Sequence, residues 1–122
     1  MELNFNYIKN TPFEKRKGDY LKVTAKYPSK LPILMETPNN QIDLKKTKFL
    51  MDYDQSLNDL IISFRKTQQL LPAEAIFLYA YDKKNLPIIL SGSDTMGIIY
   101  EKYKYNDGFL YIHVQKENTF GH

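Results

Sequence analysis

Hydrophobic positions along the chain follow two spacings, one typical of helices and one typical of strands. The clearest helical stripe stands at i, i+3, i+4 and i+7 and comprises Leu57, Leu60, Ile61 and Phe64. Ser56 precedes this stripe and is a favoured residue at a helix start, so the pattern predicts a helix from there. Residues 109–115 instead alternate along the chain, with apolar or aromatic side chains on both faces. Such a strand needs cover on both sides, which predicts a layer on each face of its sheet.

Further strands and helices can be placed from turn and capping signals. Thr11, Pro12 and Glu14 have the order of a capping box, and Pro28 ends the resulting helix near Lys26. A short helix is predicted from Thr95 to Tyr103. Strands are predicted over residues 31–36, 48–53, 75–81, 86–90 and 109–115.

The first helix offers a cover for the second face of the sheet. One of its sides carries Phe13, Tyr20, Val23 and Tyr27. Gly18 lies in its middle and predicts a kink or a frayed turn, because glycine costs about 1 kcal/mol in a helix. Residues 3–9 are expected to form a short helix or an arm that docks through its aromatic side chains.

Once the first helix is set aside, the order of elements is that of an α+β, ubiquitin-like β-grasp sheet. A ferredoxin-like sheet would need a helix between the first two strands, and the turn at residues 38–41 leaves no room for one. We therefore expect one structural domain with three parts. Residues 1–28 form an N-terminal helical extension packed on the sheet, residues 29–116 form the β-grasp core, and residues 117–122 form a flexible tail.

Composition narrows the chemistry that the chain can perform. The 122 residues are 43% hydrophobic and 25% charged, as in an ordinary globular domain. The absence of cysteine excludes thiol catalysis, cysteine-ligated zinc, iron–sulfur clusters and disulfides. A net charge of +3 with only two arginines, Arg16 and Arg65, argues against a dedicated nucleic-acid binder. With no apolar run of membrane-spanning length and no signal peptide, we expect a cytoplasmic protein.

Candidate catalytic and metal sites are weak. His113 lies in an alternating apolar strand, which favours a packed histidine over a general base. Asp52 and Asp54 lack the further ligands of a metal site, and residues 91–94 are too poor in glycine for a phosphate loop. The lysine–tyrosine alternation at residues 101–105 could stack on RNA, but a helix end with lysines near its negative dipole explains it better. We expect neither an enzyme nor a cofactor or metal site.

The last residues suggest a different chemistry. Gly121 stands next to the end of a tail that contains nothing able to pack as an element, between Phe120 and His122. An exposed glycine carboxylate can enter a narrow enzyme channel, become an adenylate and pass through a thioester to an amine. Glycine in a tail is weak evidence when taken alone.

Together with the fold, several motifs in order give a specific likeness. The chain resembles the autophagy-related ubiquitin-like modifiers, the family that includes GABARAP and the microtubule-associated light-chain proteins. The likeness runs from Pro12 to Gly121 and rests on residues 12–16, 26–32, 48–50, 95–101, 107–112 and 117–121. In those segments the chain has Pro-Phe-Glu-Lys-Arg, Lys-Tyr-Pro-Ser-Lys-Leu-Pro, Lys-Phe-Leu, Thr-Met-Gly-Ile-Ile-Tyr-Glu, Asp-Gly-Phe-Leu-Tyr-Ile and Glu-Asn-Thr-Phe-Gly.

This resemblance implies a modifier that is monomeric in solution. A cysteine protease would remove His122, and activating and conjugating enzymes would attach Gly121 to the amine of phosphatidylethanolamine. The lipidated form would lie on autophagosomal membranes and recruit cargo receptors. These receptors carry a short aromatic-x-x-aliphatic motif that adds a strand to the edge of the second strand.

The resemblance also implies where such a motif would bind. The first pocket would comprise Asp19, Val23, Pro32, Leu34, Lys48, Leu50 and Phe109. The second pocket would comprise Phe49, Met51, Leu60 and Phe64. Lys30, Lys46 and Lys48 would pair with acidic residues of the receptor, and Arg65 would help enzymes to dock. In sequence, apolar residues of a half-exposed pocket look the same as plain core residues.

Departures from the family pattern concern mainly the second pocket. Asp52 replaces a proline, Ser63 replaces an apolar residue, and Asp19 and Lys30 replace a glutamate and an arginine. The connection at residues 36–44 is shorter than usual, and the one at residues 82–94 is longer. Two other functions stay open at this point, a peptide-binding adaptor that is never conjugated and a small basic RNA-binding domain.

Overall fold

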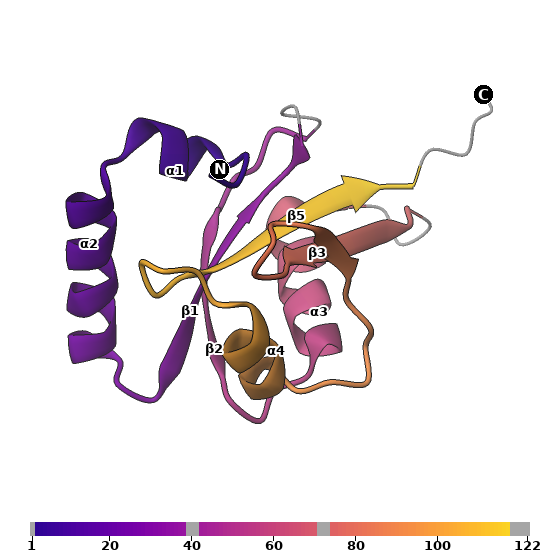
Figure 1. Cartoon of the computed structure of the whole chain (residues 1–122). Helices are drawn as coiled ribbons and strands as arrows, with labels where there is room; N and C mark the ends of the chain where they lie inside the picture. Colours follow the sequence, from indigo (N-terminus) through magenta and orange to yellow (C-terminus); the bar gives the residue numbers. More distant parts are fainter. Residues whose placement is uncertain (1, 39–41, 71–73, 118–122) are drawn as a thin grey trace.

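The computed structural model describes residues 2–38, 42–70 and 74–117 (Figure 1). The elements of these ranges are α1 (Asn6–Asn10), α2 (Phe13–Lys26), β1 (Lys30–Glu36), β2 (Lys48–Asp52), α3 (Leu57–Gln68), β3 (Ile76–Tyr81), β4 (Pro87–Ile89), α4 (Met96–Tyr103) and β5 (Leu110–Lys116). Each predicted strand and helix is present, and the short helix expected within residues 3–9 is α1.

The sheet has the strand order β2-β1-β5-β3-β4. Its two central strands, β1 and β5, run parallel with Ile33 opposite Leu110, and the other neighbours are antiparallel. This mixed sheet with α3 crossing behind it is the ubiquitin-like fold, so the predicted α+β β-grasp class is confirmed. The short β2 and β4 form the open edges of the sheet.

Alternation along β5 divides its side chains between two cores. Leu110, Ile112 and Val114 pack into a large core with α3 and α4. Phe109 and Tyr111 join a smaller core on the opposite face, where the N-terminal segment covers the sheet. The predicted cover on both faces is therefore present. The N-terminal arm supplies much of the second cover, since Leu3, Phe5 and Ile8 are all buried there.

The start of α2 differs from the prediction. Pro12, and not Thr11, occupies the cap position, and no side chain caps the helix. The Thr11 carbonyl instead accepts a hydrogen bond from Arg16 Nη1 at 2.6 Å. Phe13, expected on the packed side, is 41% exposed, whereas Arg16 is only 3% exposed. The predicted capping box was wrong because a buried arginine, contacting residues distant in sequence, holds this end of the helix.

The middle of α2 also differs from the prediction. The helix continues through Gly18 without interruption, from Phe13 to Lys26. Nothing lies within 4 Å of the place that a Cβ at Gly18 would occupy, so this side of the helix is open. The predicted kink was wrong, since the ends of the helix are held by tertiary contacts and a single glycine is tolerated between them.

The starts of the other two long helices agree with the sequence. Ser56 Oγ accepts a hydrogen bond from the Asp59 N–H at 3.1 Å, and the Asp59 carboxylate accepts one from the Ser56 N–H at 3.0 Å. This reciprocal capping box begins α3. Thr95 caps α4 by accepting a hydrogen bond from the Ile98 N–H. Both starts are local, so the sequence alone could locate them.

The turn into β5 requires glycine at one position. Gly108 has a φ of +100°, and a Cβ placed there would lie 2.5 Å from the Tyr20 ring of α2. Its carbonyl accepts a hydrogen bond from the Tyr100 hydroxyl at 2.6 Å. Because L-residues with a side chain disfavour this φ and would also clash, the turn depends on glycine for two reasons.

The described ranges contain neither a candidate membrane span nor a cluster of metal-ligand side chains. No helix there is long and apolar enough to cross a membrane. In the same part of the chain, no group of three or more His, Cys, Asp or Glu side chains could hold a metal ion.

Candidate functional site

An apolar cavity of about 360 Å³ lies between α2 and the β1–β2 edge of the sheet. It is lined by Val23, Pro32, Ile33, Lys46, Lys48, Phe49, Leu50 and Phe109. Five of the seven residues of the predicted first pocket are thus brought together from four separate segments, α2, β1, β2 and the start of β5. The additional lining by Ile33, Lys46 and Phe49 was not predicted for this pocket.

Two residues of the predicted first pocket do not line the cavity. Leu34 is buried in the smaller core beneath the N-terminal arm and is 1% exposed. Asp19 lies on α2, where its carboxylate accepts a hydrogen bond from the Tyr7 hydroxyl at 2.6 Å and pairs with Lys15 at 2.6 Å. Side chains alternate along a strand, so Leu34 lies on the same face of β1 as Pro32, which lines the cavity. The N-terminal arm covers Leu34 and closes it off from the cavity.

The edge strand β2 supplies the second part of the candidate site. Its exposure alternates, with Lys48 and Leu50 exposed and Phe49 and Met51 buried. The Thr47 carbonyl bonds back to the Met35 N–H of β1, whereas the Asp52 N–H bonds away from β1, to the Gln55 side chain. Since hydrogen-bonding directions alternate in an antiparallel strand, the backbone groups of Lys48 and Leu50 point outward. An extended peptide could pair with them.

The lysines near the cavity differ in whether they form an ion pair with a carboxylate of this chain. Lys46 Nζ lies 4.6 Å from the centre of the Phe49 ring, and Lys48 Nζ lies 4.8 Å from the centre of the Tyr7 ring. Among the described residues, neither ammonium has a carboxylate within 4 Å. Lys30, in contrast, pairs with Asp52 at 2.7 Å across the β1–β2 ladder. Two of the three lysines predicted to pair with receptor acids are therefore available, and the third already has a partner.

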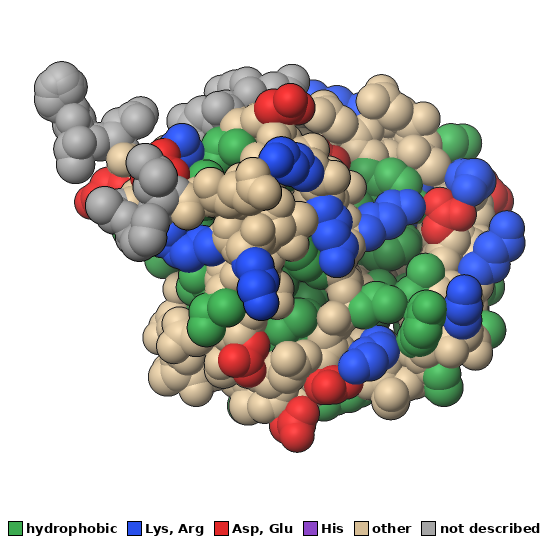
Figure 2. Space-filling model, turned by 180° about the vertical axis from the view of Figure 1, so that it is seen from behind, with side chains coloured by type: hydrophobic (Ala, Val, Ile, Leu, Met, Phe, Trp, Pro, Cys, Tyr) green, Lys and Arg blue, Asp and Glu red, His purple; other side chains and the backbone are tan. Residues whose placement is uncertain are grey.

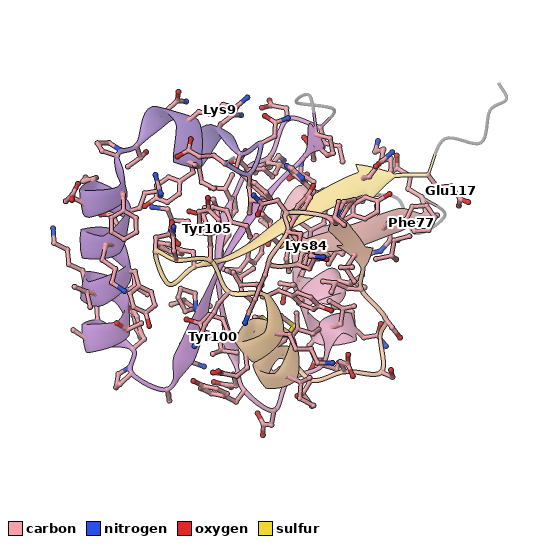
Figure 3. The ribbon with its side chains drawn as sticks, in the orientation of Figure 1. Lys9, Phe77, Lys84, Tyr100, Tyr105 and Glu117 are labelled. Carbon is pink, nitrogen blue, oxygen red and sulfur yellow. The ribbon has the colours of Figure 1, made fainter. Side chains whose placement is uncertain are left out.

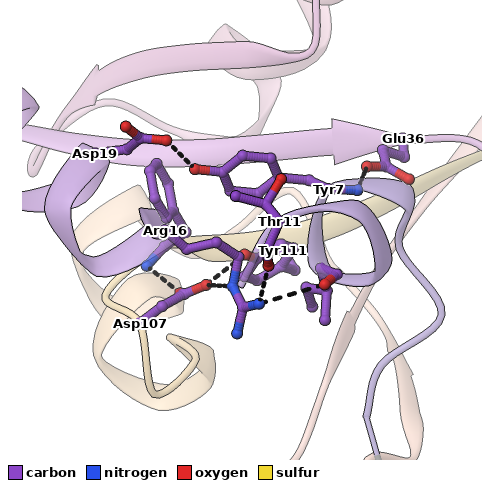
Figure 4. A network of polar contacts seen from close by, with 9 residues as sticks. Tyr7, Thr11, Arg16, Asp19, Glu36, Asp107 and Tyr111 are labelled. Atoms are coloured by element: carbon purple, nitrogen blue, oxygen red, sulfur yellow. Dashed lines mark hydrogen bonds and ion pairs between the residues drawn. The ribbon is translucent and has the colours of Figure 1, made fainter. Parts of the chain in front are cut away.

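Tyr7 is a residue of the site that the sequence did not single out. Its hydroxyl donates to Asp19 (Figure 4). Its ring lies under the Lys48 ammonium, so Tyr7 links α1, α2 and β2. The hydrogen bonds from Lys15 and Tyr7 lower the pKa of Asp19 below its ordinary value, so this carboxylate stays charged. Its aromatic position in the N-terminal arm was visible in the sequence, but its partners come from other elements.

A carboxylate of β1 places α1, the helix that carries Tyr7. Glu36 accepts hydrogen bonds from the Asn6 N–H at 2.7 Å and from the Tyr7 N–H at 3.0 Å (Figure 4). Both N–H groups belong to the first turn of the helix, where no intrahelical acceptor is available and a negative charge is favourable. The partners lie about 30 residues apart in sequence, which explains why the pattern of the chain did not reveal them.

The predicted second pocket is not open in this structure. Phe49, Met51, Leu60 and Phe64 are each no more than 3% exposed and belong to the large core. Phe49 alone also lines the first cavity. A side chain could enter between β2 and α3 only if these residues moved apart. The same apolar residues close the core, and their part in binding a peptide stays a prediction.

A buried ion pair holds the N-terminal helices against the start of β5. Arg16 Nε donates to Asp107 Oδ2 at 2.8 Å, and Arg16 Nη1 donates to the carbonyls of Ile8 and Thr11 (Figure 4). Asp107 also accepts hydrogen bonds from the Phe109 N–H and the Tyr111 hydroxyl. Burial, together with the neighbouring carboxylate, raises the pKa of the Tyr111 hydroxyl. Since Phe109 lines the cavity, this network fixes one wall of it.

Arg65 and the tail complete the predicted site residues. Arg65 is half-buried in the last turn of α3, where its carbonyl accepts hydrogen bonds that end the helix. The last strand, β5, ends at Lys116, and the Glu117 N–H bonds to the Ala75 carbonyl. Phe120, Gly121 and His122 lie outside the described residues.

The surface around these features mixes charge and apolar area. Seen from behind, Lys and Arg side chains are interspersed with exposed hydrophobic side chains, with acidic side chains toward the rim (Figure 2). Leu50, which lines the cavity, is 38% exposed. Such a surface suits a peptide that carries both apolar and acidic residues better than it suits a polyanion.

Comparisons with known proteins agree on one family. The family model described as "Autophagy protein Atg8 ubiquitin like" matches residues 15–121. Autophagy-related protein 8 of Emericella nidulans is 34% identical over 112 residues, which cover 90% of this chain and 91% of that protein. Autophagy-related protein 8d of Arabidopsis thaliana is likewise 34% identical over 112 residues, with 90% and 89% covered.

Solved structures show the same likeness. The crystal structure of Trypanosoma brucei ATG8 superposes with a TM-score of 0.84 and 35% identity, covering 97% of this chain and 99% of that one. Plasmodium falciparum Atg8, solved in complex with a Plasmodium falciparum Atg3 peptide, superposes with a TM-score of 0.73 at 24% identity, covering 88% and 92%. The second likeness concerns the fold alone.

Proposed function

The chain belongs to the Atg8 family of ubiquitin-like autophagy proteins, and from that premise we propose that it is conjugated to phosphatidylethanolamine through Gly121. As a ubiquitin-like modifier of autophagy, it would act as a ligand and a conjugate and not as a catalyst. The last strand of the described chain, β5, ends at Lys116, only a few residues before Gly121 in the sequence. A short tail of this kind can enter an enzyme channel while the domain stays folded.

The proposed route to the conjugate has three steps. A cysteine protease hydrolyses the peptide bond between Gly121 and His122 and frees the Gly121 carboxylate. An activating enzyme joins that carboxylate to AMP with release of pyrophosphate, and enzyme thiols then receive the acyl group as thioesters. Finally, the amine of phosphatidylethanolamine displaces the thiolate of the conjugating enzyme, which leaves an amide. Glycine offers no side chain that would obstruct these attacks.

The conjugate would recruit partners through the cavity and the β2 edge. One observation carries this proposal: the outward backbone groups of Lys48 and Leu50 border an apolar cavity of about 360 Å³. An aromatic side chain of an aromatic-x-x-aliphatic motif would fill the cavity while its backbone pairs with β2. Acidic residues of the motif would face Lys46 and Lys48. Cargo receptors are the proposed partners.

The conjugating enzyme is a second proposed peptide partner. The Plasmodium falciparum relative was solved with an Atg3 peptide bound. A peptide from the corresponding enzyme could use the same cavity, in competition with receptors. The aliphatic residue of either motif would need β2 and α3 to part around Phe49 and Phe64, because these residues are closed in the free protein. Arg65 would contribute to enzyme docking from the neighbouring turn of α3.

The test of conjugation is the intact mass of the protein recovered from its own cells, in soluble and membrane fractions. We expect loss of the His122 mass and, in the membrane fraction, the added mass of the phospholipid. Gly121→Ala should abolish membrane attachment, whereas His122→Ala, which keeps the glycine, serves as the matched control. A protein that keeps His122 throughout and stays in the soluble fraction would instead be an unconjugated peptide-binding adaptor.

The proposed location follows from these two forms. The unconjugated protein would be cytoplasmic, and the lipidated protein would lie on the autophagosomal membrane. Fractionation of cells with and without starvation would separate the two pools, and Gly121→Ala should leave only the first.

A further inference from the structure

A groove of about 380 Å³, separate from the cavity described above, lies near the start of β5. Leu3, Tyr81 and Tyr105 contribute apolar surface to it, and its lysines are Lys83, Lys102 and Lys104. The N-terminal arm, the β3–β4 turn and the end of α4 thus meet here. The groove shares no lining residue with the first cavity.

The groove carries positive charge that is only partly compensated. Glu101 pairs with Lys104 at 3.3 Å. The Asp82 carboxylate accepts hydrogen bonds from the N–H groups of Lys84 and Leu86, each at 2.9 Å, and so closes its own turn. Within the described ranges, Lys83 and Lys102 have no carboxylate within 4 Å. The lining therefore holds three lysines against two carboxylates, Asp82 and Glu101, and the negative end of α4 adds about half a charge, so a small positive excess remains.

The aromatic floor of the groove is already fixed by packing. The Tyr105 ring contacts the Tyr111 ring edge to face, with centroids 5.3 Å apart. The Tyr81 ring packs in the same way against Phe5, and its hydroxyl bonds to His113 Nδ1 at 2.5 Å. A ligand would therefore meet a preformed apolar surface bordered by ammonium groups, which lowers the entropy lost on binding.

The groove could bind either of two anionic ligands, a membrane surface or an acidic protein, and its position in the domain favours the protein. Tyr105 precedes β5, whereas Glu117 lies at the opposite end of that strand, where the tail begins (Figure 3). The seven residues of β5 span roughly 23 Å at about 3.3 Å per residue. If the tail carries the lipid, as proposed above, the groove lies at the end of the domain away from the membrane.

We propose that this groove binds an acidic segment of a partner protein. An apolar side chain of that segment would lie on Tyr81 and Tyr105, and its carboxylates would face Lys83 and Lys102. The site is independent of the first cavity, so a partner could occupy it while a receptor motif is bound along β2. The longer connection at residues 82–94, which departs from the family pattern, supplies Lys83.

The test is a titration of the ¹⁵N-labelled full chain with a glutamate-rich peptide that carries one central leucine. We expect the largest amide shifts at Lys102, Tyr103 and Tyr105. The double variant Lys83→Glu/Lys102→Glu should weaken binding about tenfold, because it places like charges opposite one another. The double variant Lys22→Glu/Lys66→Glu changes the net charge equally at exposed positions outside both cavities and should bind normally.

Several results would overturn this proposal. Equal loss of binding in the two double variants would mean attraction by net charge alone. Shifts at Lys48 and Leu50 in place of Tyr105 would assign the peptide to the first cavity. Binding to phosphatidylserine vesicles, lost in Lys83→Glu/Lys102→Glu, without binding to the peptide would make the groove a membrane contact. The milder Lys83→Gln variant repeats the test if the double variant fails to fold, and attachment through Gly121 is unaffected by any of these outcomes.

Discussion

The burial and the pKa of the His113 side chain are determined by residues of other elements that pack around it. Its ring stacks on the Phe5 ring with centroids 3.8 Å apart, and Nδ1 shares a hydrogen bond with the Tyr81 hydroxyl. It is 3% exposed, and burial lowers its pKa from the ordinary value of 6.5 to about 4. The sequence favoured a packed histidine over a general base, and this prediction is confirmed.

The low pKa makes the stability of the fold depend on pH. Between pH 6.5 and about 4 the unfolded chain binds a proton at this residue and the folded chain does not. Stability due to His113 is therefore complete above pH 6.5 and falls as the pH drops toward 4. The full loss is on the order of 3 to 4 kcal/mol, because the pKa falls from 6.5 to about 4 and a tenfold change in proton affinity corresponds to about 1.4 kcal/mol.

The measurement is urea unfolding of wild type and His113→Phe at a series of pH values. The variant should lose the Tyr81 hydrogen bond at pH 7 but show a flatter decline in acid. Tyr81→Phe removes the same hydrogen bond and keeps the histidine, so its decline should match that of wild type. Parallel pH curves for wild type and His113→Phe would contradict the assignment.

At the scale of elements, charged side chains anchor both N-terminal helices beside their apolar contacts. Glu36 of β1 holds the start of α1, and Arg16 of α2 reaches Asp107 in the turn before β5. Both contacts join segments far apart in sequence. Phe13 at the start of α2 and Tyr27 just after its end were expected to pack, but each is 41% exposed.

Loss of the Arg16 side chain should destabilise the whole N-terminal cover. Arg16→Met would leave the Asp107 carboxylate buried without its cation, which typically costs about 3 to 5 kcal/mol. Urea unfolding measures this loss, and Lys22→Met on the exposed side of α2 should change stability by less than about 0.5 kcal/mol. The double variant Arg16→Met/Asp107→Asn should recover part of the loss, because no unpaired charge then remains. A loss below about 1 kcal/mol for Arg16→Met would contradict this role.

The first cavity depends on the whole molecule, since α2, β1, β2 and the start of β5 all contribute to it. Its apolar lining and its cations act on different parts of a peptide. The lining is short-ranged and indifferent to salt, whereas attraction by Lys46 and Lys48 is screened by salt. The two contributions can therefore be separated by experiment.

We expect Lys46→Glu/Lys48→Glu to weaken binding of an aromatic-x-x-aliphatic peptide with flanking glutamates about tenfold, and to remove most of the salt dependence of its Kd. Leu50→Ala should weaken binding by about 1 to 2 kcal/mol and leave the salt dependence unchanged. Isothermal titration at two salt concentrations measures both. The double variant Lys9→Glu/Lys22→Glu, at exposed positions outside the cavity lining, is the matched charge control. Equal salt dependence in wild type and Lys46→Glu/Lys48→Glu would exclude these lysines as the acid-binding groups.

Local patterns in the sequence were sufficient for most elements of the fold. The capping box at Ser56, the stripe of α3, the turn at Asp107–Gly108 and the two-faced alternation of β5 each involve residues close together in the chain. Such patterns follow from helical and extended geometry, so they can be recognised without the tertiary structure. Together with the element order, they led to the β-grasp class and to the family.

Only the tertiary structure decided how apolar residues divide between core and cavity. Leu34 and Phe64 are closed into the cores, while Leu50 and Pro32 line an open cavity, although the sequence shows all four only as apolar residues. The long-range polar contacts of Arg16 and Glu36 were equally invisible. Burial and pairing depend on which distant segments meet, and a periodic pattern records only the face on which a residue lies.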